Sequence, residues 1–62
     1  MMTAEKGDTI SWTFPNTPEE PEDFRGKTFT AQVAKVFTEE QCYGVYAEYG
    51  QDLIPFDKAT IQ

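Results

Sequence analysis

Apolar and polar residues alternate along two neighbouring stretches in the middle of the chain. Thr28–Phe37 carries an apolar residue at every second position from Phe29 to Val33, and Tyr43–Tyr49 repeats the pattern from its first residue to its last. A period of two is typical of strands with one buried face, and the β-branched and aromatic residues here favour a pleated surface. The two stretches therefore predict a β-hairpin.

The alternation breaks once within the first of these strands. Val36 follows Val33 by three residues, so an unbroken strand would turn Val36 toward solvent. A bulge or bend near Ala34 restores the parity and gives the curvature that a small barrel needs. The polar segment Thr38–Cys42 lacks glycine and predicts a turn of about four or five residues between the strands.

A third alternating stretch, Thr9–Phe14, follows the turn signal Gly7–Asp8 and predicts the first strand. Its apolar members are Ile10, Trp12 and Phe14.

The segment Pro15–Gly26 has the opposite character. Prolines recur at every third position, which favours an extended polyproline-like backbone and excludes a continuing strand. We expect a long loop that is either functional or mobile. Phe24 is placed to fold back and plug one end of a barrel, with Arg25 and Gly26 turning into the next strand. The loop is acidic through Glu19, Glu20, Glu22 and Asp23.

After the hairpin, the pattern predicts a tight turn at Gly50–Asp52 and a short strand from Leu53 that Pro55 ends. One 3₁₀ turn fits within Pro55–Ala59, before a last short strand at Thr60–Ile61. The fold class expected is all-β: a small five-stranded barrel with a long acidic, proline-rich loop after the first strand and a 3₁₀ turn before the last.

Length and composition allow one domain. At 62 residues the core is small, and the 15% of aromatic residues are what fill it. We expect a frayed terminus over Met1–Lys6 and a folded domain over 7–62. The single cysteine, Cys42, fits a reducing compartment. The sequence has no long apolar run, so we do not expect it to associate with a membrane. The cytoplasm is the location expected.

Charge narrows the partners. The chain has 11 Asp and Glu against 5 Lys and Arg, a net charge of -6 and a pI near 4.3. Nucleic-acid binding needs clustered cations, so the overall balance disfavours it, although binding confined to one face stays open.

The order of these segments resembles the KOW-type and SH3-like small barrels, as found in short bacterial proteins. The resemblance rests on GDTISW, FRGKTFTAQVAKVF, YGVYAEY and YGQDLIPFDKATIQ and covers roughly Lys6 to Ile61. It implies a "GD.I" first strand, a Gly-led second strand, a third strand and a 3₁₀ turn before the last. Such barrels make RNA or protein contacts in ribosome- and transcription-associated assemblies, or serve as accessory subunits. The acidic loop stands here where nucleic-acid-binding members are basic.

Residues suited to catalysis are scarce. Histidine is absent, which removes the commonest general base and metal ligand. Cys42 has no basic neighbour, and we interpret it as a passive small side chain, with a redox or nucleophilic role as the alternative. The acidic loop lacks the spacing of a Ca²⁺ site; it is a solubilising loop, a partner-binding loop or, last, a metal site. We therefore predict a protein without enzymatic activity, cofactor or metal.

Aromatic residues are the better candidates for contact. Tyr46 has the opposite parity to Tyr43 and Val45, so it should point outward, either to pack across strands or to meet a partner. Trp12 is either core or contact. The residues predicted to bind a partner are Tyr46, Trp12, Phe24, Arg25, Lys27 and Lys35.

Three functions follow from these residues. The first is a module without catalysis that docks an unidentified protein partner through an exposed aromatic or apolar patch that includes Tyr46. The second is KOW-like binding of RNA through Arg25, Lys27 and Lys35 with a stacking aromatic. The third is an enzyme or redox protein that acts through Cys42. We favour them in that order.

Overall fold

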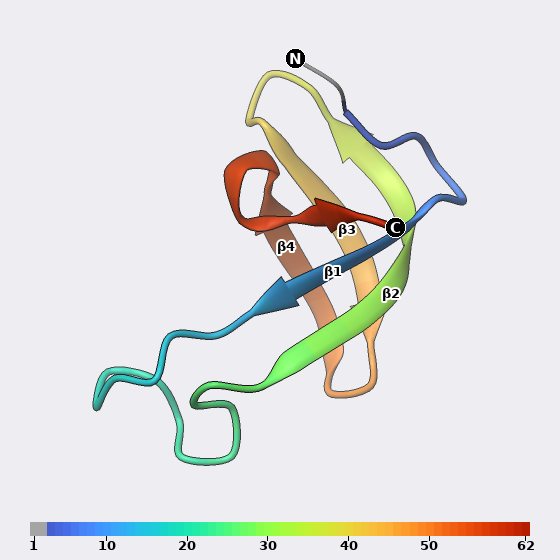
Figure 1. The fold of residues 1–62 in the computed structure, drawn as a ribbon. Coiled ribbons are helices and arrows are strands. Elements are labelled where there is room, and N and C mark those ends of the chain that lie inside the picture. The colour runs from blue at the N-terminus through green and yellow to red at the C-terminus, as the bar shows by residue number, and fades with distance from the viewer. Residues whose placement is uncertain (1–2) are drawn as a thin grey trace.

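The chain forms five antiparallel strands in the structure, a computed structural model that describes residues 3–62 (Figure 1). They form one sheet in the order β4-β3-β2-β1-β5. The prediction of an all-β fold with five strands, and with a 3₁₀ turn before the last of them, is confirmed. The elements are β1 (Thr9–Thr13), β2 (Thr28–Phe37), β3 (Cys42–Ala47), β4 (Gly50–Pro55), η1 (Phe56–Lys58) and β5 (Thr60–Ile61).

The long strand β2 joins two halves of the sheet. Its first half pairs with β1 through Thr28 to Gln32, and its second half pairs with β3 from Val33 onward. The register shifts between Val33 and Lys35, as predicted for a bulge near Ala34. Because β2 bends, β1 and β5 cross in front of the β3–β4 hairpin (Figure 1).

The predicted closed barrel is not formed. The sheet ends at β4 on one side and β5 on the other, and no ladder among residues 3–62 joins these two strands. Pro55, which has no N–H, ends β4, and β5 contains two residues. The fold is therefore an open sheet bent over its own core.

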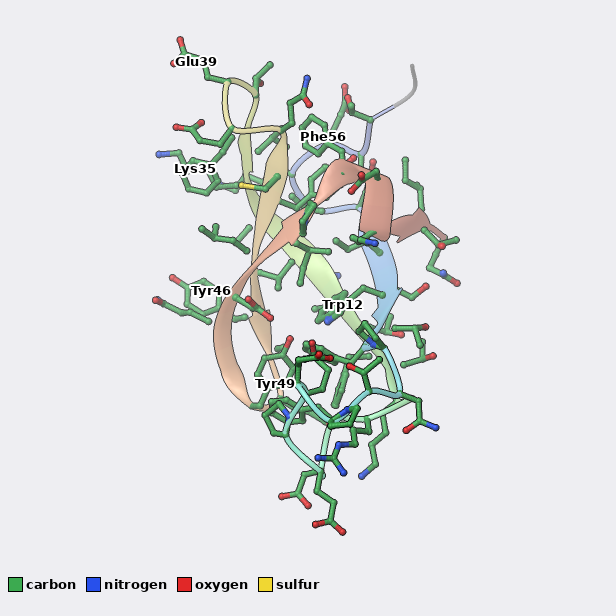
Figure 2. All side chains as sticks on the ribbon, turned by 90° about the vertical axis from the view of Figure 1, so that its left-hand side faces the viewer. Trp12, Lys35, Glu39, Tyr46, Tyr49 and Phe56 are labelled. Atoms are coloured by element: carbon green, nitrogen blue, oxygen red, sulfur yellow. The ribbon has the colours of Figure 1, made fainter. Side chains whose placement is uncertain are left out.

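The core lies between the two halves of the sheet, where Figure 2 shows Trp12. Its buried side chains alternate along the strands, as the period of two requires. They are Ala4, Ile10, Trp12, Val33, Tyr43, Val45 and Ile54.

One end of the core is covered by η1 and the N-terminal segment. The ring of Phe56 lies 4.6 Å from that of Tyr43, centroid to centroid, and the Ala4 N–H donates to the Tyr43 hydroxyl at 2.7 Å. Although we expected a frayed terminus over Met1–Lys6, Ala4 is buried; Met1 and Met2 lie outside the described residues.

The other end is covered by an aromatic cluster, which we define as Phe14, Phe24, Phe29 and Tyr49. Phe24 lies 5.1 Å from Phe14 and 4.8 Å from Tyr49, centroid to centroid, so its predicted return toward the core is confirmed. Such ring pairs contribute beyond the area they bury. Phe24 thereby attaches the C-terminal part of the loop Pro15–Lys27 to the sheet.

The loop itself was predicted incorrectly as extended. Its backbone makes successive turns, with the Glu20 N–H bonded to the Thr17 carbonyl and the Phe24 N–H to the Pro21 carbonyl. The exposed Arg25 side chain lies along the loop and donates to the carbonyl oxygens of Glu20 at 2.9 Å and Pro18 at 3.3 Å. These bonds satisfy backbone groups of the loop, which cannot pair as a strand because its prolines lack an N–H.

The turn before β4 was also predicted incorrectly. Glu48–Tyr49 form the turn, and Gly50 is the first residue of β4, paired with Ala47. Gly50 has a φ of 121°, a conformation that side chains rarely adopt. Glycine is thus required just after the turn, as the first residue of the strand, rather than within the turn as predicted.

The outer edge of β4 has few free donors. The two-residue turn makes Ala47 and Gly50 a hydrogen-bonded pair, so Gln51, Leu53 and Pro55 direct their backbone groups away from β3. Pro55 has no N–H, and the Leu53 N–H donates to Asp52 Oδ1 at 2.8 Å. Two of these three positions therefore cannot donate to a further strand.

Candidate interaction face

The outer face of β2, β3 and β4 carries the most exposed large apolar side chains of the described chain. Tyr46 is 68% exposed and Leu53 is 58% exposed. Tyr46 points outward, as its parity predicted, while its neighbour Val45 is buried (Figure 2). Leu53 pairs with Gly44, two residues before Tyr46 on β3, so both side chains lie on this face.

A glycine allows an aromatic ring to approach the backbone closely on the same face. A Cβ added to Gly44 would stand 2.9 Å from Cε2 of Phe37, so the ring occupies the place of a side chain. Lys35 Nζ lies 5.1 Å from the centre of that ring, within the range of a cation–π contact. Lys35 is thus held beside an apolar surface.

Two open hollows adjoin on this face, with volumes of about 580 and 480 Å³. Tyr46 and Ala34 line both, so the bulge in β2 and the exposed ring separate them. The larger hollow is lined by Ala34, Lys35, Phe37, Gly44, Val45, Tyr46, Gln51, Asp52 and Leu53. The smaller is lined by Lys6, Gly7, Thr30, Ala31, Gln32, Val33, Ala34 and Tyr46. We call this surface the Tyr46 face.

The charge of the Tyr46 face differs from that of the chain. Its charged lining residues are Lys6, Lys35 and Asp52. Both carboxylate oxygens of Asp52 already accept hydrogen bonds, from the Tyr49 hydroxyl at 2.6 Å and from the Leu53 N–H at 2.8 Å. Asp52 also pairs with the buried Val45, which directs its carboxylate to the core side of the sheet. The charged residues that line the outer side, next to Tyr46, are therefore the cations Lys6 and Lys35, although the whole chain has a net charge of -6.

Tyr49 connects this carboxylate to the core. Its hydroxyl accepts a hydrogen bond from Trp12 Nε1 at 3.1 Å and donates one to Asp52. Burial, with the Asp52 bond and charge adding to it, raises the pKa of Tyr49 to about 12, against an opposing effect of the Trp12 bond. The hydroxyl is thus kept protonated and serves as a structural link.

The remaining predicted contact residues are dispersed. Trp12 is 4% exposed, and Phe24 packs in the aromatic cluster, so both support the fold. The guanidinium of Arg25 is engaged by loop carbonyls. Lys27 precedes β2 and Lys35 lies near its other end, about 25 Å along an extended strand. Of the predicted set, the structure places Tyr46 and Lys35 together on the Tyr46 face.

The sequence analysis missed Phe37, Leu53, Lys6 and Asp52. Leu53 and Phe37 are recognisable as outward residues only once the pairing with Gly44 and Cys42 is known. Lys6 reaches the face because the Gly7 N–H bonds to the Val33 carbonyl, a contact between distant segments.

The cysteine and the acidic residues of the chain all lie within the described residues 3–62. Cys42 is a free, buried thiol, 8% exposed. In the same part of the chain, no three Cys, Asp or Glu side chains converge as a metal site would require. None of the helical segments described is long and apolar enough to cross a membrane.

Comparisons of the chain with protein-family models, with curated proteins and with solved structures give no match.

Proposed function

We propose that this chain is a small SH3-like interaction module of the cytoplasm, which binds a protein partner on the Tyr46 face and performs no catalysis. The observation that carries the proposal is the pair of exposed apolar side chains, Tyr46 and Leu53, beside adjoining hollows on one rigid sheet. Exposed aromatic and aliphatic groups that gather on one surface mark interaction sites, and tyrosine is favoured there.

The rigidity of the face supports this role. The pairing of β3 with both β2 and β4 holds Tyr46 and Leu53 at fixed positions. Because Gly44 has no side chain, the Phe37 ring covers the backbone of β3 at that point. A site on strands loses less conformational entropy on binding than one on a loop. The strand order and the position of η1 before β5 support the SH3-like assignment.

Binding of RNA in a KOW-like manner is the second candidate, and the distribution of charge weakens it. Arg25 is bound within the acidic loop, and Lys27 and Lys35 lie at opposite ends of β2. A phosphate backbone requires adjacent cations. A titration with single-stranded RNA at several salt concentrations tests this candidate; strong, salt-dependent binding would favour it over a protein partner.

The proposal is tested by site-specific photocrosslinking in cells. A photoreactive benzoylphenylalanine replaces Tyr46 in one variant and Thr60 in another. Thr60 is exposed on β5 and lines neither hollow. We expect a discrete protein adduct from position 46 and none from position 60. Equal adducts at both positions, or none at position 46, would refute the proposed face.

A further inference from the structure

We infer that the Tyr46 face binds a peptide segment in which an aromatic or aliphatic anchor is flanked by carboxylates. This inference rests on the proposed function and specifies the chemistry of the partner. Three features of the face support it: the closed edge of β4, the two hollows on either side of Tyr46, and the position of the cations.

The edge of β4 determines how a peptide is held. Pro55 lacks an N–H and the Leu53 N–H is occupied by Asp52, so a partner strand would find two of the three outward donors missing. Strand addition depends on such main-chain bonds. The peptide is therefore held by its side chains, across the face rather than along its edge.

The two hollows determine the apolar part of the ligand. Each adjoins Tyr46, and the larger is bounded by Phe37 and Leu53. An anchor side chain in the larger hollow would bury Leu53 and the ring of Tyr46, which are otherwise exposed. Burial of apolar area at such a centre supplies most of the affinity of a small interface.

The charges determine the flanks. Lys35 lines the larger hollow and Lys6 the smaller, one on each side of Tyr46. Asp52 pairs with the buried Val45, so its charged carboxylate is directed to the core side of the sheet, where it bonds to Tyr49, and away from the Tyr46 ring. Glu5 precedes Lys6 in the chain and weakens its field, which leaves Lys35 as the stronger cation. Carboxylates on both sides of the anchor complement this pattern.

A second copy of the chain is a poorer occupant. In a two-fold dimer the Tyr46 face would meet the same face of the other copy, which presents the cations Lys6 and Lys35 and no carboxylates to complement them. A basic peptide would instead be drawn to the exposed carboxylates of the loop, such as Glu19 and Glu22. The preference of the Tyr46 face for acidic segments therefore separates it from the rest of the surface.

The test uses a displayed library of random short peptides, selected on the immobilised full chain. We expect the enriched peptides to carry a net negative charge around an aromatic or aliphatic residue. A synthetic copy of one of them should lose about tenfold or more in affinity for the Tyr46→Ala variant. Enrichment of net positive peptides whose binding is lost in Tyr46→Ala, or no enrichment above that obtained on Tyr46→Ala, would overturn the inference.

Charge reversal supplies the matched control. Lys35→Glu and Lys58→Glu change the net charge equally, but Lys58 lies in η1 and lines neither hollow. We expect Lys35→Glu to weaken the selected acidic peptide about tenfold and Lys58→Glu to change it less than twofold. Equal losses, or concentration-dependent dimers that require Tyr46, would contradict an acidic peptide ligand. Crosslinks from position 46 to a protein with a basic contact segment would retain the proposed function and reject this inference alone.

Discussion

The Trp12 indole N–H donates a hydrogen bond to the Tyr49 hydroxyl at 3.1 Å, across 37 positions of the sequence. The same hydroxyl donates to Asp52 at 2.6 Å. A polar chain thus runs from the buried side chain of β1 to the exposed edge of β4. It joins the two halves of the bent sheet, which have no ladder between β4 and β5.

Replacement of Tyr49 by Phe should destabilise the fold. The variant keeps the ring but leaves the Trp12 N–H without its partner, a loss of about 1–3 kcal/mol. Urea unfolding followed by Trp12 fluorescence measures the change. Tyr46→Phe is the matched control. Because Tyr46 is 68% exposed, this substitution should lower the free energy of unfolding by less than about 0.5 kcal/mol. Equal effects of the two variants would show that the polar chain does not stabilise the fold.

Alkaline pH should remove the contribution of Tyr49. Its pKa is raised from 10.0 to about 12 in the folded chain, chiefly by burial. The unfolded chain therefore loses this proton first as the pH rises, so the contribution is complete below pH 10.0 and is lost toward about pH 12. We expect the difference in unfolding free energy between wild type and Tyr49→Phe to narrow over this range. A constant difference would contradict the raised pKa.

Gly44→Ala should have opposite effects in two backgrounds. In the wild type the new methyl group would meet the Phe37 ring at 2.9 Å, and displacing the ring costs about 1 kcal/mol. In the Phe37→Ala background the space is free, and alanine in a strand gains about 0.5 kcal/mol over glycine. Denaturant unfolding of the wild type, the two single variants and the double variant gives a double-mutant cycle. Additive effects would mean that the ring does not lie on Gly44.

Phe24→Ala should destabilise the domain although Phe24 lies in a loop. Its half-buried ring packs against Phe14, Phe29 and Tyr49, and its loss is expected to cost about 2 kcal/mol. The variant should also be cleaved faster by protease within the loop. Glu22→Ala, at an exposed loop position, is the control and should remain within about 0.5 kcal/mol of wild type. A Phe24→Ala variant as stable as the control would mean that the loop is independent of the sheet.

Local patterns predicted most of the strands. The period of two located β1, β2 and β3. Val36, which breaks the apolar alternation after Val33, predicted the bulge found between Val33 and Lys35. The turn before β4 was misplaced because Gly50 was interpreted as its first residue, whereas its positive φ is needed at the start of the strand. The barrel did not close, since closure depends on long-range pairing that no local pattern encodes.

The candidate site was less predictable for the same reason. The outward direction of Tyr46 follows from parity alone, and the structure agrees. The hollows depend on how β2 bends, on the Phe37 ring over Gly44 and on the approach of Lys6 to β2. Each of these features is a contact between segments far apart in the sequence, and the local alternation of apolar and polar residues does not reveal such contacts.

The edge of β4 has a consequence for how the protein behaves at high concentration. Small β proteins polymerise when a bare strand recruits the same strand from another molecule, which begins a fibril. Here a carboxylate beside Leu53 occupies its amide, and a proline two residues later supplies none. The edge of β4 is thus a poor template for such recruitment, although Tyr46 and Leu53 beside it are exposed.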